Sequence, residues 1–163
     1  MVTLEGKPIA LSGDLPEVGS YAPGFSLVDG SMNTVSLSDF KGKKVLLNIF
    51  PSIDTDVCAR SVEEFHRRAL ERDNLVVLGI SKDLPFAQKR FCMSKNLDRV
   101  ITLSGFRDRE FGSDYGLDIL DSPIAGLYAR SVVVIDEKGK VVYRERVPEI
   151  TREPDYETAL AAL

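Results

Sequence analysis

The chain lacks several residues that mark familiar protein classes. It has no tryptophan, only two cysteines and a single histidine among its 163 residues. Two cysteines are too few for the disulfide framework of a small secreted protein. A structural zinc site needs four Cys or His ligands and a catalytic one needs three protein ligands, so this supply falls short unless carboxylates assist. We therefore expect no metal centre.

Long apolar runs and a basic surface are also missing. No apolar stretch approaches the ~20 residues that span a bilayer, and the start of the chain, Met1–Pro8, lacks the basic and apolar regions of a signal peptide. The net charge is −4, and the 21 basic and 25 acidic side chains are interspersed, whereas nucleic-acid binding needs a clustered basic face. We expect a cytoplasmic protein without membrane or nucleic-acid partners.

Two catalytic motifs are absent as well. The chain contains no glycine-rich loop of the Walker or dinucleotide type, so nothing in it indicates a bound nucleotide. It contains no CxxC pair, which argues against a directly poised dithiol.

What the chain does contain is the composition of an ordinary globular protein, 44% hydrophobic and 28% charged. It has no internal repeat, low-complexity tract or convincing linker. At this length we expect a single domain over residues 1–163, able to bury roughly 68–70% of its unfolded surface.

Hydrophobic periodicity predicts two hairpins followed by alternating strands and helices. The hairpins are expected over residues 2–11 and 25–37, where glycines punctuate the turns. The predicted elements after them are strand 44–50, helix 58–72, strand 75–80, helix 85–95, strand 100–103, hairpin 131–147 and helix 155–163. A βαβ section followed by a hairpin and a helix predicts a mixed central β-sheet flanked by helices, the three-layer α/β class.

The junction between strand 44–50 and helix 58–72 carries the first chemical candidate, Cys58. It ends the octapeptide Pro51-Ser-Ile-Asp-Thr-Asp-Val-Cys58. Unpaired backbone N–H groups and the helix dipole favour negative charge in the first turn of a helix. Such a position can lower a cysteine pKa from about 8.5 to roughly 3.5–7.5, which favours the nucleophilic thiolate. The junction predicts redox or nucleophilic chemistry, although many cytosolic cysteines are only small buried hydrophobes.

Three neighbours could equip this thiol. Thr55 lies three residues upstream, where its hydroxyl can turn back towards the sulfur, and Pro51 can shape the loop and screen one side of it. Arg130 immediately precedes the strand 131–135, and a neighbouring strand could bring its guanidinium to the Cys58 loop. There it would hold a thiolate and offer directed donors to an incoming oxygen.

Cys92 is the second candidate, near the end of the predicted helix 85–95. Its neighbours Phe91 and Met93 suit core packing as well as a redox role. A bond to Cys58 would require the two Cα atoms to approach within about 7 Å, which could demand local loosening of both helices. Such a disulfide would form during turnover.

The single histidine, His66, lies eight residues beyond Cys58 on the same predicted helix, or about 12 Å along its axis. A cysteine hydrolase needs its base within hydrogen-bond reach of the thiol. We therefore expect His66 to be a packed or surface residue, and the hydrolase class is disfavoured.

Pro51, Thr55 and Cys58 together match the Pro-x-x-x-Thr/Ser-x-x-Cys motif of the peroxiredoxins, and the chain resembles that family. With Cys92 and Arg130 added, it is similar to the atypical two-cysteine branch of the family, the bacterial thiol peroxidases. The resemblance covers nearly the whole chain. Its mild departures are Tyr128, where a leucine is usual, and Gly105, where an acidic residue is common.

The resemblance implies a thioredoxin-like fold with an added N-terminal β-hairpin, and a peroxidase for hydrogen peroxide and organic (alkyl) hydroperoxides in antioxidant defence. Cys58 would be the peroxidatic cysteine and Cys92 the resolving cysteine, which condenses with the sulfenic acid into an intramolecular disulfide. Thr55 and Arg130 would orient the peroxide, and Pro51 would shield the sulfur.

The resemblance also implies partners. A thioredoxin-like reductant would reopen the disulfide, no cofactor is needed in the protein itself, and family members are generally homodimers. Ile124, Leu127, Tyr128 and Met93 could supply apolar walls for an alkyl hydroperoxide, but they suit the core equally. The alternative functions are a non-enzymatic redox sensor or partner-binding module of the same fold, without fast turnover, and a structural domain with inert cysteines.

Overall fold

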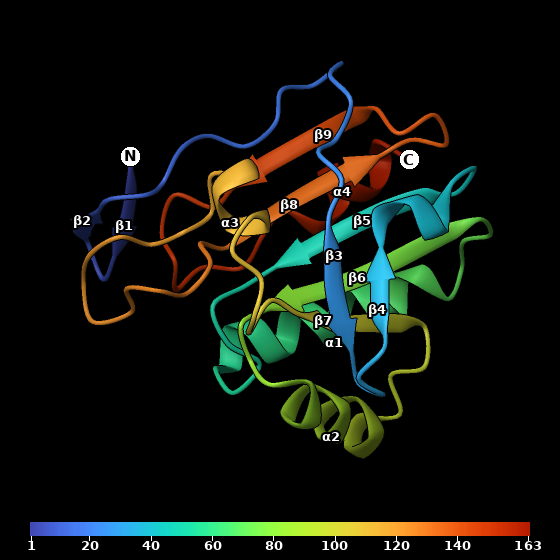
Figure 1. Cartoon of the computed structure of the whole chain (residues 1–163), viewed down its shortest axis with the longest axis horizontal. Helices are drawn as coiled ribbons and strands as arrows, with labels where there is room; N and C mark the ends of the chain where they lie inside the picture. Colours follow the sequence, from blue (N-terminus) through green and yellow to red (C-terminus); the bar gives the residue numbers. More distant parts are fainter.

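A seven-stranded mixed sheet forms the centre of the computed structural model, which describes residues 1–163 (Figure 1). Its strand order is β4-β3-β7-β6-β5-β8-β9, and a separate two-stranded hairpin, β1-β2, lies to one side of it. The strands are β1 (Val2–Leu4), β2 (Lys7–Ile9), β3 (Ser26–Asp29), β4 (Thr34–Ser36), β5 (Lys44–Ile49), β6 (Leu75–Ser81), β7 (Val100–Ser104), β8 (Ser131–Ile135) and β9 (Val141–Arg146). The helices are η1 (Leu37–Phe40), α1 (Asp56–Ala69), α2 (Pro85–Lys95), α3 (Phe111–Asp114) and α4 (Tyr156–Ala161).

Strand β5 lies in the middle of the sheet and is apolar on both faces. It pairs in parallel with β6 and antiparallel with β8. Because successive side chains of a strand point to opposite faces, β5 contributes alternately to two hydrophobic clusters, one on each side. Both faces of the sheet are therefore buried, as the nearly continuous apolar run of residues 45–50 predicts.

The two faces have different covers. One cluster joins α1 and α4 to the sheet, and half-buried Phe91 and Cys92 of α2 pack against it. The other lies under β3, α3 and the N-terminal segment, with Phe25, Phe111 and Tyr115 in mutual aromatic contact. This arrangement confirms the predicted α/β class, with the mixed sheet, flanking helices and N-terminal hairpin.

Some predicted boundaries are wrong by a few residues. The first long helix spans Asp56–Ala69 rather than 58–72, because Thr55 has extended backbone angles and caps the helix two residues earlier. The short helix α3 was not expected, since four residues are too few to show helical periodicity. Helix α2 has the predicted bounds, with Pro85 at its first position and Asn96 in the left-handed conformation at its end.

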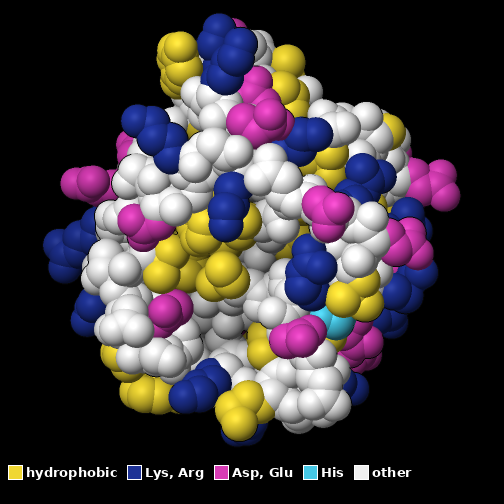
Figure 2. Space-filling view, turned by 90° about the vertical axis from the view of Figure 1, so that its right-hand side faces the viewer, with side chains coloured by type: hydrophobic (Ala, Val, Ile, Leu, Met, Phe, Trp, Pro, Cys, Tyr) yellow, Lys and Arg dark blue, Asp and Glu magenta, His cyan; other side chains and the backbone are white.

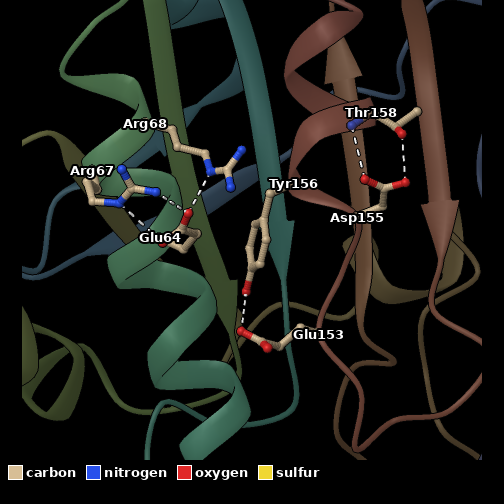
Figure 3. A network of polar contacts seen from close by, with 7 residues as sticks. All are labelled: Glu64, Arg67, Arg68, Glu153, Asp155, Tyr156 and Thr158. Carbon is tan, nitrogen blue, oxygen red and sulfur yellow. Dashed lines mark hydrogen bonds and ion pairs between the residues drawn. The ribbon is translucent and has the colours of Figure 1, made fainter.

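Polar and aromatic contacts hold the C-terminal segment against α1 (Figure 3). The Tyr156 ring meets Phe65 edge-on, with 5.0 Å between the ring centres, and the guanidinium of Arg68 lies 5.6 Å from the same ring. The Tyr156 hydroxyl donates to Glu153 (3.0 Å), while Arg68 also donates to Glu64 on its own helix (2.6 Å). These contacts tie the start of α4, which packs on β8 and β9, to α1.

None of the helices is long and apolar enough to cross a membrane. No group of three or more His, Cys, Asp and Glu side chains has an arrangement that could hold a metal ion.

Gly105 and Tyr128 fit each other closely, so we expect Gly105→Ala to destabilise the fold. A Cβ at Gly105 would overlap the buried Tyr128 hydroxyl oxygen and lie 3.0 Å from the ring carbon that bears it. Overpacking of this kind costs about 1–3 kcal/mol. The Tyr128 hydroxyl has no hydrogen-bond partner, so Tyr128→Phe should be tolerated and should reduce the cost of Gly105→Ala. Urea unfolding of the two single variants and the double variant measures this coupling. An equal cost of Gly105→Ala in both backgrounds would contradict the account.

Candidate active site

Cys58 is the third residue of α1 and is fully buried, with 0% of its surface exposed. Its first-turn position follows from the cap at Thr55, whose carbonyl accepts the first helical hydrogen bond, from the Ala59 N–H (2.9 Å). The Cys58 carbonyl accepts from the Ser61 hydroxyl (2.7 Å), which in turn accepts from the buried Asn48 amide (3.1 Å). The thiol therefore lies in the first turn, beside the positive end of the helix dipole.

Arg130 reaches this sulfur from the neighbouring strand, as the sequence predicts. Ser131 pairs with Ile49 across β8 and β5, which places Arg130 next to the loop that follows β5. Nη2 of Arg130 lies 3.2 Å from Sγ of Cys58, and Nε donates to the carbonyl of Ile150 (2.9 Å). The residue is only 2% exposed, and its Nη1 has no partner. The site thus combines a thiol, a buried cation and a free donor.

Thr55 immediately precedes α1, but its hydroxyl does not donate to the Cys58 sulfur. It donates instead to the Ser52 carbonyl (3.1 Å), which also accepts from the Thr55 backbone N–H (3.2 Å). This turn carbonyl has no strand partner, so it takes up the nearest donors. Thr55 is exposed, whereas Pro51 is buried at the other end of the loop.

Asp83 contacts the loop before Cys58, although the sequence analysis did not identify it. It follows β6, and its carboxylate accepts from the Ser52 hydroxyl (2.8 Å) and the Ile53 backbone N–H (2.7 Å). The Ser81 hydroxyl donates to it as well, and Ser81 also accepts from the buried Gln88 of α2. Asp83 thereby connects the loop before Cys58 with the start of the helix that carries Cys92. No sequence motif announces a contact between positions so far apart.

Cys92 lies in the last turn of α2 and is half-buried against the cluster that contains Cys58. Both cysteines are free thiols. Burial raises the pKa of the Cys92 thiol, and a hydrogen bond with the Thr102 side chain partly opposes this. The structure thus brings both cysteines to one face of the sheet on separate helices.

The other residues singled out in the sequence lie in several different environments. His66 is held by the carboxylate of Asp98 (3.1 Å) on the surface side of α1, away from the thiol as predicted. Tyr128 is a core residue, Ile124 and Leu127 pack on the small cluster under the N-terminal hairpin, and Met93 is exposed. Tyr128 is therefore no wall for a substrate.

A cavity of about 300 Å³ lies at the opposite end of the sheet from Cys58, where β5 begins. Its apolar lining comes from Tyr21, Leu37, Phe40 and Ile135 together with smaller side chains. Figure 2 views this end of the molecule, where hydrophobic side chains gather beside a hollow and charged side chains of both signs surround them. Neither cysteine lines this cavity, so it is separate from the thiol site.

Comparison with known proteins places these features in a family. The model of the redoxin family matches residues 17–160. The chain is 55% identical to the thiol peroxidase of Mycobacterium bovis over 162 residues, which cover 99% of this chain and 97% of the relative.

Solved structures agree with this assignment. A peroxiredoxin-like protein from Aquifex aeolicus superimposes with a TM-score of 0.92 at 37% identity, over 99% of this chain and 94% of the other. A thiol peroxidase from Chromobacterium violaceum gives 0.91 at 25% identity, over 98% and 93%. The fold is the thioredoxin-like fold of peroxiredoxins, and the chain belongs to the redoxin family as a thiol peroxidase, a peroxidase of the peroxiredoxin type.

Proposed function

We propose that this chain reduces hydrogen peroxide and alkyl hydroperoxides with Cys58 as the attacking thiol and Cys92 as the resolving thiol. The contact of 3.2 Å between Nη2 of Arg130 and Sγ of Cys58 is the observation that carries the proposal. A buried guanidinium at this distance stabilises the thiolate, because it donates a charge-assisted hydrogen bond where water is scarce.

The first step breaks the O–O bond of the peroxide. The Cys58 thiolate attacks one oxygen, an S–O bond forms, and the second oxygen leaves with the bonding electron pair and takes up a proton as water or an alcohol. Arg130 supports this step with its Nη1, which is buried and has no partner in the protein. A donor placed in advance where charge develops is a large contribution to catalysis.

The second step joins the two cysteines. The Cys58 sulfenic acid condenses with the Cys92 thiol, water leaves, and a disulfide forms. Both side chains pack on the same cluster, but Cys58 is fully buried in α1, so the step needs local opening of the helix turns. Burial raises the pKa of Cys92, which favours its neutral thiol form in the folded, reduced protein.

The third step requires a partner. A dithiol protein of the thioredoxin type attacks the disulfide, and two exchanges return both cysteines to thiols while the reductant is oxidised.

We further propose that residues 1–163 form one peroxiredoxin domain and that the protein is a homodimer without a bound cofactor. We also propose that it works in the cytoplasm, where thiols are kept reduced. Sedimentation measures the oligomeric state.

Steady-state kinetics test the proposal and the substrate class together. Peroxide consumption is followed with thioredoxin as reductant, first with hydrogen peroxide and then with a bulky organic hydroperoxide. We expect saturable turnover that depends on thioredoxin. A protein that forms the disulfide but turns over no faster than a free thiol would instead be a redox sensor.

Replacement of Arg130 by methionine should slow the oxidation of Cys58 by about 10²–10³-fold, the usual cost of losing a donor placed at developing charge. The reason is the loss of both the contact to Sγ and the free Nη1. The rate is measured by stopped-flow mixing with hydrogen peroxide, per folded molecule. Arg152→Met is the matched control, because Arg152 is exposed and makes no side-chain hydrogen bond or ion pair. Equal rates for both variants would remove Arg130 from the site.

A further inference from the structure

One carboxylate fastens the N-terminal hairpin to the C-terminal part of the chain. Oε1 of Glu149 accepts hydrogen bonds from the Thr3 hydroxyl (2.9 Å) and the Gly6 backbone N–H (2.8 Å). Its Oε2 accepts from the backbone N–H (2.9 Å) and the hydroxyl (2.8 Å) of Thr151. These donors, led by the backbone N–H groups of Thr151 and Gly6, lower the pKa of Glu149 to about 2. The Glu149 carboxylate is partly exposed, but four hydrogen bonds hold it in one position.

The same hairpin holds the backbone on either side of Glu149. The Thr3 N–H donates to the Pro148 carbonyl (2.8 Å), and the Ile150 N–H donates to the Thr3 carbonyl (2.9 Å). Strand β1 therefore runs beside residues 148–150 as a short parallel partner. Ile150 is buried under the hairpin in a small apolar cluster with Val2. The hairpin thus sets the place of the Ile150 peptide group.

The Ile150 carbonyl connects the N-terminal hairpin to the thiol site. It accepts from Nε of Arg130 (2.9 Å), and Nη2 of the same guanidinium lies 3.2 Å from Sγ of Cys58. A guanidinium is planar, so fixing Nε fixes the directions of both Nη groups. These two are the only hydrogen bonds of the Arg130 side chain. The orientation of the Arg130 guanidinium therefore depends on the Ile150 carbonyl, which the hairpin holds in place.

We propose that Glu149 is a positioning residue for Arg130: it ties the hairpin to residues 148–151 and so holds the Ile150 carbonyl that directs the guanidinium at Cys58. This inference rests on the proposed function, which gives the contact between Arg130 and Cys58 its role in peroxide reduction. The hairpin then contributes to the reaction although it lies outside the main sheet (Figure 1).

The far end of the C-terminal segment is anchored independently. Glu153 accepts a hydrogen bond from Tyr156 (3.0 Å; Figure 3). Glu153 also lies 3.8 Å from Arg60 of α1, and the Tyr156 ring packs on Phe65. Loss of the Glu149 contacts should therefore loosen residues 148–151 locally, while Glu153 and Tyr156 keep the following residues tied to α1. A Glu149 variant can thus be tested as a folded protein.

Glu149→Gln is the informative variant. Glutamine keeps one acceptor oxygen, but its NH₂ group faces donors where the carboxylate accepted, so about half of the contacts are lost. We expect oxidation of Cys58 by hydrogen peroxide to slow about tenfold, since a misplacement of ~1 Å can cost up to roughly 100-fold. We also expect alkylation of Cys58 at one fixed pH to change in rate, because its sulfur loses the Arg130 donor. Both rates are measured with Cys92→Ser present, so that only Cys58 reacts. Glu5→Gln, on the same hairpin and without a side-chain partner, should change neither.

A double-mutant cycle separates positioning from general stability. With Arg130→Met present, Glu149→Gln should slow the oxidation no further, because there is no guanidinium left to aim. The same tenfold loss in both backgrounds would overturn the proposal, since Glu149 would then act through the fold alone. If Arg130→Met slows the reaction and Glu149→Gln does not, the inference is wrong while the proposed function stands. If Arg130→Met itself has no effect, the assignment of the site fails and this inference falls with it.

Discussion

Cys58→Ser should lower peroxide consumption to the uncatalysed background. The expected loss is at least roughly 10⁴-fold, because enzymes generally accelerate their reactions by about 10⁶-fold or more. Serine has nearly the same shape and can still accept from Arg130, so the buried site stays filled. Its hydroxyl, however, does not ionise near neutral pH, and no sulfenic acid can form on oxygen. The variant therefore removes the chemistry and leaves the packing almost unchanged.

The loss is measured by peroxide consumption with thioredoxin as reductant, and folding is checked by thermal unfolding of the same sample. Ser94→Ala is a suitable comparison that should keep normal turnover, because it removes an exposed hydroxyl that bonds to neither cysteine side chain. Normal turnover of Cys58→Ser would show that another group attacks the peroxide, and the account of the site would be wrong.

Cys92→Ser should consume one peroxide per chain and then stop. Cys58 is intact and keeps its contact with Arg130, so the first oxidation proceeds at the normal rate. No second thiol is then available to condense with the sulfenic acid, because the chain has only two cysteines. The thioredoxin-dependent steady state should therefore fall to the background, while the first turnover remains as a burst.

Rapid mixing separates the burst from the steady state. Ser94→Ala, on an exposed position of the same helix, should keep both phases. Full thioredoxin-dependent turnover by Cys92→Ser would mean that the reductant attacks the sulfenic acid directly and that Cys92 is a packing residue. A missing burst would mean that Cys92 supports the first step instead.

The sheet could be predicted because strong local patterns mark its elements. Strand β5 is a continuous apolar run, and α2 is bounded by Pro85 and Asn96, residues with well-defined roles at helix ends. The meeting of Arg130 with Cys58 could also be expected, since adjacent strands bring the ends of β5 and β8 together.

Other parts of the site could not be predicted, for equally physical reasons. The partner that orients Arg130 is the backbone carbonyl of Ile150, and every residue has a carbonyl. Asp83 accepts a hydrogen bond from the Ile53 backbone N–H, and no sequence motif links two positions 30 residues apart. The Thr55 hydroxyl was expected near the sulfur, but it donates to the carbonyl of Ser52, because short-range competition for donors is invisible in the sequence.

The whole catalytic cycle depends on a disulfide between Cys58 and Cys92, and peptide mass spectrometry detects this bond. Reduced protein is mixed with one equivalent of hydrogen peroxide, alkylated and digested with trypsin, which releases the peptides 45–60 and 91–95. We expect these two peptides to be joined by a disulfide and to separate on reduction. Recovery of both peptides with alkylated thiols, while peroxide is consumed, would contradict it.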